Sequence, residues 1–418
     1  MGRDQFLNAK RLLSLIACSL IFPLTAGNIH VGKGLSINTI TDALQTAGAG
    51  DSIIVHPGTY REVVVISLPV VLMGIGDPVI DGNQQGDVVS VFADSVFMEG
   101  FVIVNSGRSS LTDYAGLKIN KGYRGIVVNN NQFTDNSIGI FVQDAEDCRI
   151  TNNRIKTSIG ESSLMGNAIH CWKCKNLEIG KNHIRSHRDG IYLEFVSNSL
   201  VRDNDVAKCL RYGLHFMFSN EDEYLYNRFS ENGAGVAVMF SSRINMLHNT
   251  FDNNKGGASY GLLLKDISHG NIASNQFTGN TVGILMDGGL SLSLQENIFS
   301  GNGWAIRLMS SSTENTFTMN NFLGNTFDIT TNGTSEKNFF SENYWDKYRG
   351  YDLDRDGIGD VPYHPLSLFA VISEYTPAAM LFFRSFLVDL LEQAERIIPT
   401  VTPRNFVDDK PSMKPYTL

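Results

Sequence analysis

The sequence predicts an all-β protein folded as a parallel β-helix, a solenoid with about 22 to 23 residues in each turn. Three observations predict this fold. Asn, any residue and an apolar branched or aromatic residue recur along the chain, apolar and variable residues alternate over short stretches, and no helix-length periodic segment separates these stretches. Each turn of such a stack buries its apolar side against its neighbours. The repeat begins at Asn131, Asn153, Asn182, Asn204, Asn227, Asn249, Asn275, Asn297 and Asn320.

The recurring Asn residues are predicted to be structural. A side-chain amide that turns inward at a tight corner can hydrogen-bond the backbone of the adjacent turns. Asn residues that stack at one corner then form a ladder. Longer loops at Thr157–Met165 and Asn254–Tyr260 account for the larger gaps in the repeat.

The strands are predicted where a small residue precedes an alternating segment, as in Gly190–Phe195, Gly213–Met217 and Gly235–Met239. A period of two over so few residues indicates a strand with one buried face. A leucine-rich horseshoe would place Asn at a different offset, and the blade of a propeller needs about 40 residues. We therefore expect residues 28–349 to form the β-helix.

The amino-terminal residues 1–27 are typical of a secretory signal peptide. Basic residues precede an apolar run from Leu12 to Leu24, and small residues follow it. A lipoprotein cleavage box at Leu15–Cys18 is the less favoured alternative, because the apolar run before it is short. Cleavage after Gly27 would place His30 third from a free amine, an arrangement that chelates Cu(II). We expect an exported protein.

The two ends of the solenoid are predicted to carry helices. Ser36–Gly48 has a helical pattern and is expected to cap the amino-terminal end. Residues 366–418 are expected to hold an amphipathic helix at Pro377–Ile398 and an irregular tail. This helix has two open interpretations, a second cap on the solenoid or a docking helix for a partner or the membrane surface. Its apolar face is formed by Phe383, Phe386, Leu387, Leu390, Leu391, Ala394 and Ile397.

The charge balance excludes one class of function. The net charge is −9 and charged residues make up 18% of the chain. Nucleic-acid binding needs a basic face or stripe, so we expect no nucleic-acid partner.

Five contiguous segments carry a resemblance to a known family, and they are His187–Phe195, Leu210–Phe218, Asn232–Met239, Gly256–Lys265 and Asn343–Tyr348. They resemble the NosD family of nitrous oxide reductase maturation proteins. The resemblance implies a right-handed β-helix of the carbohydrate-binding and sugar-hydrolase type, located in the periplasm. It also implies copper binding and a role in building the copper–sulfide site of nitrous oxide reductase. The implied partners are the permease and ATPase of an ABC-type transporter, a copper-chaperone lipoprotein and the reductase itself, with membrane contact only through partners.

Alignment of the strands on their leading small residue gives two outward columns. Adjacent turns lie about 4.8 Å apart, so neighbouring residues in a column touch. The first column reads Phe141, His170, Tyr192, His215, Ala237, Leu263, Leu285 and Arg307. The second column reads Gln143, Trp172, Glu194, Met217, Met239, Lys265, Asp287 and Met309.

These columns predict a copper site on the outward face. Imidazole and thioether ligands suit copper, whereas carboxylate pairs suit magnesium or calcium. The predicted ligands are His170, Glu194, His215, Met217 and Met239. The alternative is a metal-free scaffold, on which Met and aromatic side chains contact a partner or a sugar.

An enzyme on the same fold is the competing class of function. Tyr192, Glu194, His215 and Lys265 could act as base, acid and charge neutraliser of a polysaccharide lyase or uronate epimerase. A glycosidase needs two carboxylates about 5–9 Å apart, and no partner for Glu194 is evident in the columns. The family resemblance favours a protein without catalytic activity.

The cysteines have several interpretations. Cys171 and Cys174 form a CxxC pair, but Cys171 falls in a core-facing register, so a buried apolar role is favoured over metal binding. A disulfide between Cys148 and Cys174 is a further option in an oxidising compartment. Cys209 is expected to be an isolated loop residue with a reactive thiol.

An acidic loop over residues 350–365 resembles a calcium-binding loop. Asp352, Asp354 and Asp356 occupy its first, third and fifth positions, and Asp360 its ninth. The twelfth position is Tyr363 instead of Glu, so a bidentate ligand would have to come from elsewhere. A solvated acidic turn without a metal is the alternative.

Overall fold

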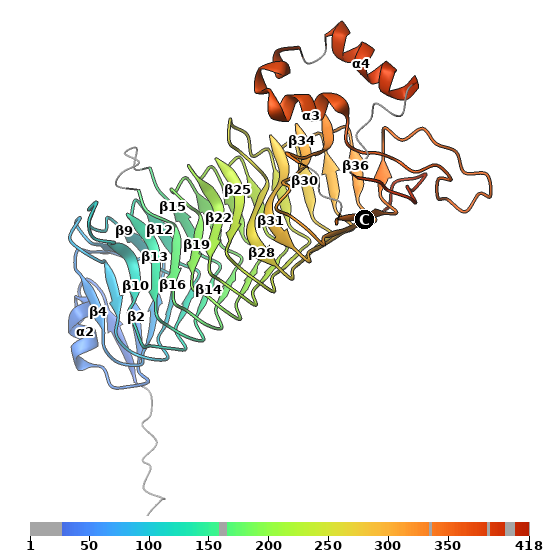
Figure 1. Ribbon diagram of the computed structural model, residues 1–418. Coiled ribbons are helices and arrows are strands. Elements are labelled where there is room, and N and C mark those ends of the chain that lie inside the picture. The colour runs from blue at the N-terminus through green and yellow to red at the C-terminus, as the bar shows by residue number, and fades with distance from the viewer. Residues whose placement is uncertain (1–26, 159–164, 334–336, 383–384, 398–405, 418) are drawn as a thin grey trace, which may run out of the picture.

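The computed structural model describes residues 27–158, 165–333, 337–382, 385–397 and 406–417. It confirms a parallel β-solenoid of about 13 turns (Figure 1). Each turn contributes one strand to each of three sheets, and every strand pairs in parallel with its counterpart in the next turn. Stacking turn on turn satisfies the backbone groups of all strands except those at the two ends.

The first sheet has fourteen strands among the described residues. They are β1 (Asn28–Val31), β2 (Ser52–Val55), β5 (Val71–Gly74), β8 (Phe97–Glu99), β11 (Val127–Asn129), β14 (Arg149–Thr151), β17 (Glu178–Gly180), β20 (Leu200–Arg202), β23 (Glu223–Leu225), β26 (Asn245–Leu247), β29 (Asn271–Ala273), β32 (Ser293–Gln295), β35 (Thr316–Thr318) and β38 (Phe339–Ser341).

The second sheet has thirteen strands in the described part of the chain. They are β3 (Thr59–Tyr60), β6 (Val79–Asp81), β9 (Val102–Val104), β12 (Gln132–Thr134), β15 (Arg154–Lys156), β18 (His183–Arg185), β21 (Asp205–Ala207), β24 (Arg228–Ser230), β27 (Thr250–Asp252), β30 (Gln276–Thr278), β33 (Ile298–Ser300), β36 (Asn321–Leu323) and β39 (Tyr344–Trp345).

The third sheet, with twelve described strands, carries the two outward columns. Its strands are β4 (Val64–Ile66), β7 (Val89–Val91), β10 (Ala115–Ile119), β13 (Ile138–Gln143), β16 (Ile169–Trp172), β19 (Ile191–Glu194), β22 (Tyr212–Met217), β25 (Ala234–Met239), β28 (Leu262–Ser268), β31 (Val282–Leu290), β34 (Trp304–Leu308) and β37 (Phe327–Thr330).

The predicted Asn ladder is confirmed. Asn249 is fully buried, and its Oδ1 accepts from the backbone N–H of Asn227 at 2.9 Å and from Asn227 Nδ2 at 3.0 Å. Its own Nδ2 donates to the carbonyl of Tyr224 and to Oδ1 of Asn275. The same contacts run from Asn131 to Asn343.

A second Asn ladder, which the sequence analysis missed, lies five residues after the first. Asn232, Asn254, Asn280 and Asn302 each donate a backbone N–H to the side chain of the next turn. The signal was present in the sequence, because these residues repeat with the same period as the first ladder. Each turn in this region therefore has two corners closed by buried amides.

Inside the solenoid, the aromatic residues that follow Asn227 and the later residues of the first ladder form a continuous stack from Phe229 to Trp345. The rings of Phe251 and Phe277 lie 4.6 Å apart and within 1° of parallel, and Phe322 stacks on Trp345 at 4.0 Å. Identical side chains in identical registers pack without gaps, which gives the core its density.

The amino-terminal cap is confirmed as α2 (Ile40–Thr46), which buries Ile40 and Ala43 against the first turns. The Glu62 carboxylate accepts from the backbone N–H groups of Ile40 and Thr41, so these two N–H groups at the start of the helix have acceptors. The predicted signal peptide, including Cys18, lies outside the described residues apart from Gly27. His30 lies in β1, whose backbone pairs with β2.

The predicted helix at Pro377–Ile398 corresponds to two helical segments in the structure, and a third, which was not predicted, precedes them. The three segments are α3 (Leu368–Tyr375), the 3-10 helix η1 (Pro377–Phe382) and α4 (Phe386–Ile397). Pro377 has no backbone N–H and disfavours helical dihedrals at Thr376, which ends α3. Among the described residues, none of the helices combines the length and the apolar composition that crossing a bilayer requires.

The described part of the tail, residues 406–417, is irregular as predicted, with isolated bridges and bends, and it returns to the solenoid. The buried carboxylate of Asp408 accepts from Asn343 N, from Asn343 Nδ2 and from Trp345 Nε1 at 3.0 to 3.1 Å. Asp408 therefore takes the place that the next Asn of the ladder would have. Tyr416 also exchanges two hydrogen bonds with Asn321.

Replacing Asn249 by Ala should reduce the free energy of unfolding by about 3 kcal/mol, because it leaves several buried backbone and amide groups unpaired. Chemical denaturation monitored by circular dichroism measures this. Asn245→Ala is the matched control, since this half-buried residue of β26 lies in the same turn but outside the ladder. Equal losses in both variants would contradict a special role for the ladder.

Candidate functional site

The two outward columns are brought together as the sequence predicted. Neighbouring strands place Phe141 beside His170, His170 beside Tyr192, and Tyr192 beside His215. The second column continues in the same way from Trp172 through Glu194, Met217 and Met239 to Lys265. The third sheet is thus the element that positions the predicted copper ligands.

His170 and His215 do not lie next to each other, because the Tyr192 ring lies between them. Ring centroids are 4.8 Å apart for His170 and Tyr192 and 4.9 Å apart for Tyr192 and His215. Burial lowers the pKa of His170 to about 4, so its imidazole is neutral at physiological pH. A neutral imidazole is the form that binds metals.

His215 lies in an enclosed polar cluster that the sequence analysis did not identify. Its Nδ1 is 3.7 Å from the carboxylate of Asp189, and its ring packs against Tyr212 at 4.8 Å. Asp189 is itself buried and lies 3.6 Å from Arg211. Asp189 directly precedes the leading Gly190 of its strand, a position that the two-column alignment left out.

Met217 and Met239 form the accessible part of the predicted site. They are paired across adjacent strands, and both are partly exposed at the ends of β22 and β25. Glu194 pairs with Met217 on the other side and is also partly exposed. The two thioethers are therefore accessible, whereas His215, two residues before Met217 on the same face of β22, is close to fully buried.

The residues present fit a soft metal such as copper. Neither ring nitrogen of His215 makes a hydrogen bond, and Nε2 of His170 is also without a partner, although all three atoms are buried. Unsatisfied buried nitrogen atoms beside thioethers match the ligand preference of Cu(I). His170, Glu194 and His215 are not among the groups of described residues that bring three His, Cys, Asp or Glu ligand atoms within 4.8 Å. A site here would therefore depend on the Met pair.

Of the four residues of the enzyme alternative, His215 is buried, whereas Tyr192, Glu194 and Lys265 are partly exposed. Burial and the neighbouring Glu194 raise the pKa of Tyr192 to about 12, which keeps the phenol protonated. His215 is enclosed by Tyr192, Tyr212 and Asp189. A general base needs a lower pKa and access to the substrate.

The core interpretation of Cys171 is confirmed, while the prediction of a reactive Cys209 was wrong. Cys148, Cys171, Cys174 and Cys209 are free and buried, so the disulfide option is not realised. Burial raises the pKa of the Cys209 thiol to about 12. Cys209 lies five residues after Asn204, in the column of the second ladder, which turns its side chain inward. A protonated, enclosed thiol is inert.

The acidic loop gathers its first three carboxylates. Asp352, Asp354 and Asp356 place ligand atoms within 4.8 Å of one another in the described structure. The backbone N–H groups of Arg355 and Gly357 donate to Asp352, which is how such loops fold around a cation. Asp360 is outside this group, and its Oδ2 accepts from Leu353 N at 2.7 Å. Calcium binding stays a prediction.

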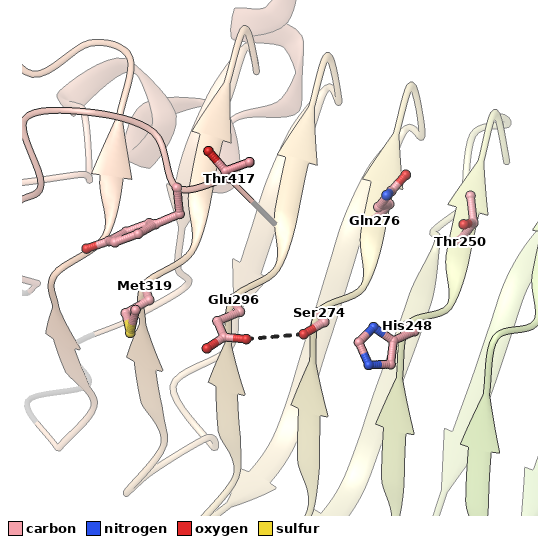
Figure 2. A pocket seen from close by; sticks show the side chains of 8 residues that line it. His248, Thr250, Ser274, Gln276, Glu296, Met319 and Thr417 are labelled. Carbon is pink, nitrogen blue, oxygen red and sulfur yellow. Dashed lines mark hydrogen bonds between the residues drawn. The ribbon is translucent and has the colours of Figure 1, made fainter.

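A groove of about 590 Å³ lies on another corner of the solenoid (Figure 2). Its lining includes His248, Glu296 and Met319, and Ser274 Oγ donates to Glu296 Oε2 at 3.3 Å. The carboxyl-terminal residues Tyr416 and Thr417 also line this groove. None of the sequence-predicted ligands lines it.

Two family models match the chain. One, described as periplasmic copper-binding protein (NosD), matches residues 156–350, and the other, described as a protein of unknown function (DUF1565), matches residues 31–245. Two similar proteins are both named probable ABC transporter binding protein NosD. The one from Pseudomonas aeruginosa is 26% identical over 374 residues, covering 85% of this chain and 87% of the relative. The one from Stutzerimonas stutzeri is 26% identical over 372 residues, covering 85% of each.

Among solved structures, the chain is similar to the catalytic unit of the thermostable GH87 α-1,3-glucanase from Streptomyces thermodiastaticus strain HF3-3. The TM-score is 0.59 and the identity 15%, over 76% of this chain and 68% of that chain. At this identity the likeness shows the β-helical fold alone.

Proposed function

We propose that this chain, which belongs to the NosD family, binds copper in the periplasm and takes part in maturing the copper–sulfide site of nitrous oxide reductase. It works with the permease and ATPase of an ABC-type transporter and receives copper from a chaperone lipoprotein. The predicted signal peptide supplies the export. In this role copper is cargo, and the protein performs no catalysis.

The pairing of Met217 with Met239, on the same strand face as His215, is the observation that carries this proposal. Two thioethers at the surface can accept Cu(I) from a donor without a high barrier, because soft ligands exchange it readily. The buried imidazole of His215 adds a nitrogen ligand, and Glu194 lies beside Met217. His170 lies beyond Tyr192 and would belong to a second position along the same face.

The first test is an anaerobic Cu(I) titration against a competing chelator. We expect the double variant Met217→Ala/Met239→Ala to bind Cu(I) roughly 100-fold more weakly than the wild type, a loss of about 3 kcal/mol. Met309→Ala is the matched control, because Met309 belongs to the same predicted column but lies several turns away. The His215→Ala variant tests the nitrogen ligand separately.

Equal Cu(I) affinity in the double variant and the wild type would show that copper binds at another site. No binding by the wild type would leave a metal-free scaffold, the alternative that the sequence left open.

The carboxyl-terminal helices support docking on the transporter. α3 caps the solenoid, since Phe369 and Ala370 are buried and Glu374 forms an ion pair with Arg307 at 2.6 Å. α4 packs on α3 and stands away from the solenoid (Figure 1). Both η1 and α4 carry exposed apolar side chains, which are Leu381, Phe382, Phe386, Leu387 and Leu390.

Such a contiguous apolar face needs a partner, because soluble surfaces rarely leave one open. We therefore propose that helix α4 binds in an apolar groove of the permease. Helix α3 holds α4 at the end of the solenoid.

We expect Phe386→Glu/Leu390→Glu to abolish co-purification with the detergent-solubilised permease and ATPase, because each substitution places a charge in the apolar contact. Phe339→Glu is the control, since Phe339 is 65% exposed and lies on the first sheet, outside α4. Copper affinity should not change in any of these variants. Retained co-purification of the double variant would argue against α4 as the docking element.

We also propose that the acidic loop binds calcium weakly through Asp352, Asp354 and Asp356. The expected result is that calcium raises the melting temperature of the wild type, since a ligand that binds only the folded state stabilises it. Asp354→Asn/Asp356→Asn should remove this shift, whereas Asp266→Asn on a distant corner should keep it. A shift of the same size in the double variant would show that calcium binds elsewhere.

A further inference from the structure

A second surface groove, of about 640 Å³, lies beside the third sheet. It is closer to the amino-terminal end of the solenoid than Met217 and Met239 are. It is built from four successive turns, so no single segment of the sequence contains it. Its lining residues are Phe92, Asn120, Lys121, Tyr123, Gln143, Asp144, Trp172 and Lys173.

Three aromatic rings form the apolar part of this groove. Phe92 is 43% exposed, and its ring meets that of Tyr123 edge-on, with centroids 6.4 Å apart and an angle of 88°. Trp172 is partly exposed, and Lys173 Nζ lies 4.5 Å from its ring centroid. Tyr123 and Trp172 are partly buried against the apolar clusters of the solenoid and Phe92 is exposed, so the three rings present an apolar surface to a ligand in the groove.

The polar part of the groove combines amides with positive charge. Asn120 and Gln143 supply amide donors and acceptors, and Lys121 and Lys173 oppose the single carboxylate of Asp144. This surplus of positive charge contrasts with a net charge of −9 for the whole chain. The groove therefore favours an anionic ligand.

Backbone N–H groups at the groove already have hydrogen-bond acceptors within the solenoid. The N–H groups of Gly122, Asp144 and Lys173 donate to carbonyl groups of the next turn at 2.8 to 2.9 Å. Recognition is thus left to the side chains, and these three N–H groups offer no nest for a phosphate group.

We propose that this groove binds an acidic oligosaccharide, a short chain of pyranose units that carry carboxylates. The apolar C–H faces of pyranoses pack on aromatic rings, their hydroxyl groups bond with Asn120 and Gln143, and their carboxylates pair with Lys121 and Lys173. A shallow groove that crosses several turns suits an extended polymer, because each turn offers the same set of positions again.

Two other classes of ligand fit the geometry less well. A nucleobase binds best between or on parallel rings, but Phe92 and Tyr123 are perpendicular. A peptide strand would need a free sheet edge, whereas each strand in these turns pairs on both sides.

The test is isothermal titration calorimetry of the mature protein with hexagalacturonate, and with maltohexaose, ATP and polyglutamate as comparators. We expect binding of hexagalacturonate that weakens as salt is raised, and no measurable binding of maltohexaose. Trp172→Ala and Lys121→Gln/Lys173→Gln should each weaken this binding at least roughly tenfold. Phe339→Ala, which removes an exposed ring from another sheet, should leave the affinity unchanged.

Several results would overturn the proposal. These are no binding of hexagalacturonate, equal or tighter binding of maltohexaose, ATP or polyglutamate, or unchanged affinity in the Trp172 variant with its fold intact by circular dichroism. Copper affinity is measured separately in the same variants and should stay unchanged, so a failure here is distinct from a failure of the copper proposal.

Discussion

The hydrogen bond from one backbone N–H to the Asn side chain of the next turn is the interaction on which the solenoid depends. It repeats from Asn131 to Asn343, and every donor and acceptor involved is buried. An amide side chain offers both a donor and an acceptor, so one residue satisfies the corner of its own turn and that of its neighbour. Because the ladder fixes the corner of each turn, it also fixes the register of all three sheets. The outward face of His and Met residues is a consequence of that register.

The ladder also explains where the structure departs from a regular repeat. His187 and Cys209 occupy the column of the second ladder before Asn232, and both lie in the turns that carry the His and Met face. Both are buried, and burial lowers the pKa of His187 to about 4. In these turns, the corner that precedes the strands of the proposed copper face therefore lacks the Asn of the second ladder. The first ladder continues through these turns from Asn153 to Asn227 and holds them in place.

The carboxyl-terminal end shows a separation of tasks. Asp408 closes the first ladder, and α3 covers the last strand β37, so the open end of the solenoid is satisfied without α4. Helix α4 is then free to expose apolar residues that a cap would have buried. A cap and a docking element, which the sequence left as alternatives for one helix, are two different helices in the structure. The proposed transporter contact and the proposed copper face lie on different parts of the molecule (Figure 1).

The sequence by itself determined the fold class, the column of each outward residue and the structural role of Asn, because a fixed period in a parallel stack leaves a single register. It therefore placed Met217 beside Met239 and Tyr192 between His170 and His215 correctly. Only the tertiary structure decided which of these side chains are buried. The burial of His215, for example, depends on Asp189 and Tyr212, which lie outside the two columns and contact its ring. The tertiary structure also decided that Cys209 points inward and that Asp408, 65 residues after Asn343, ends the ladder. Contacts of that kind join segments outside the repeat, and no local period encodes them.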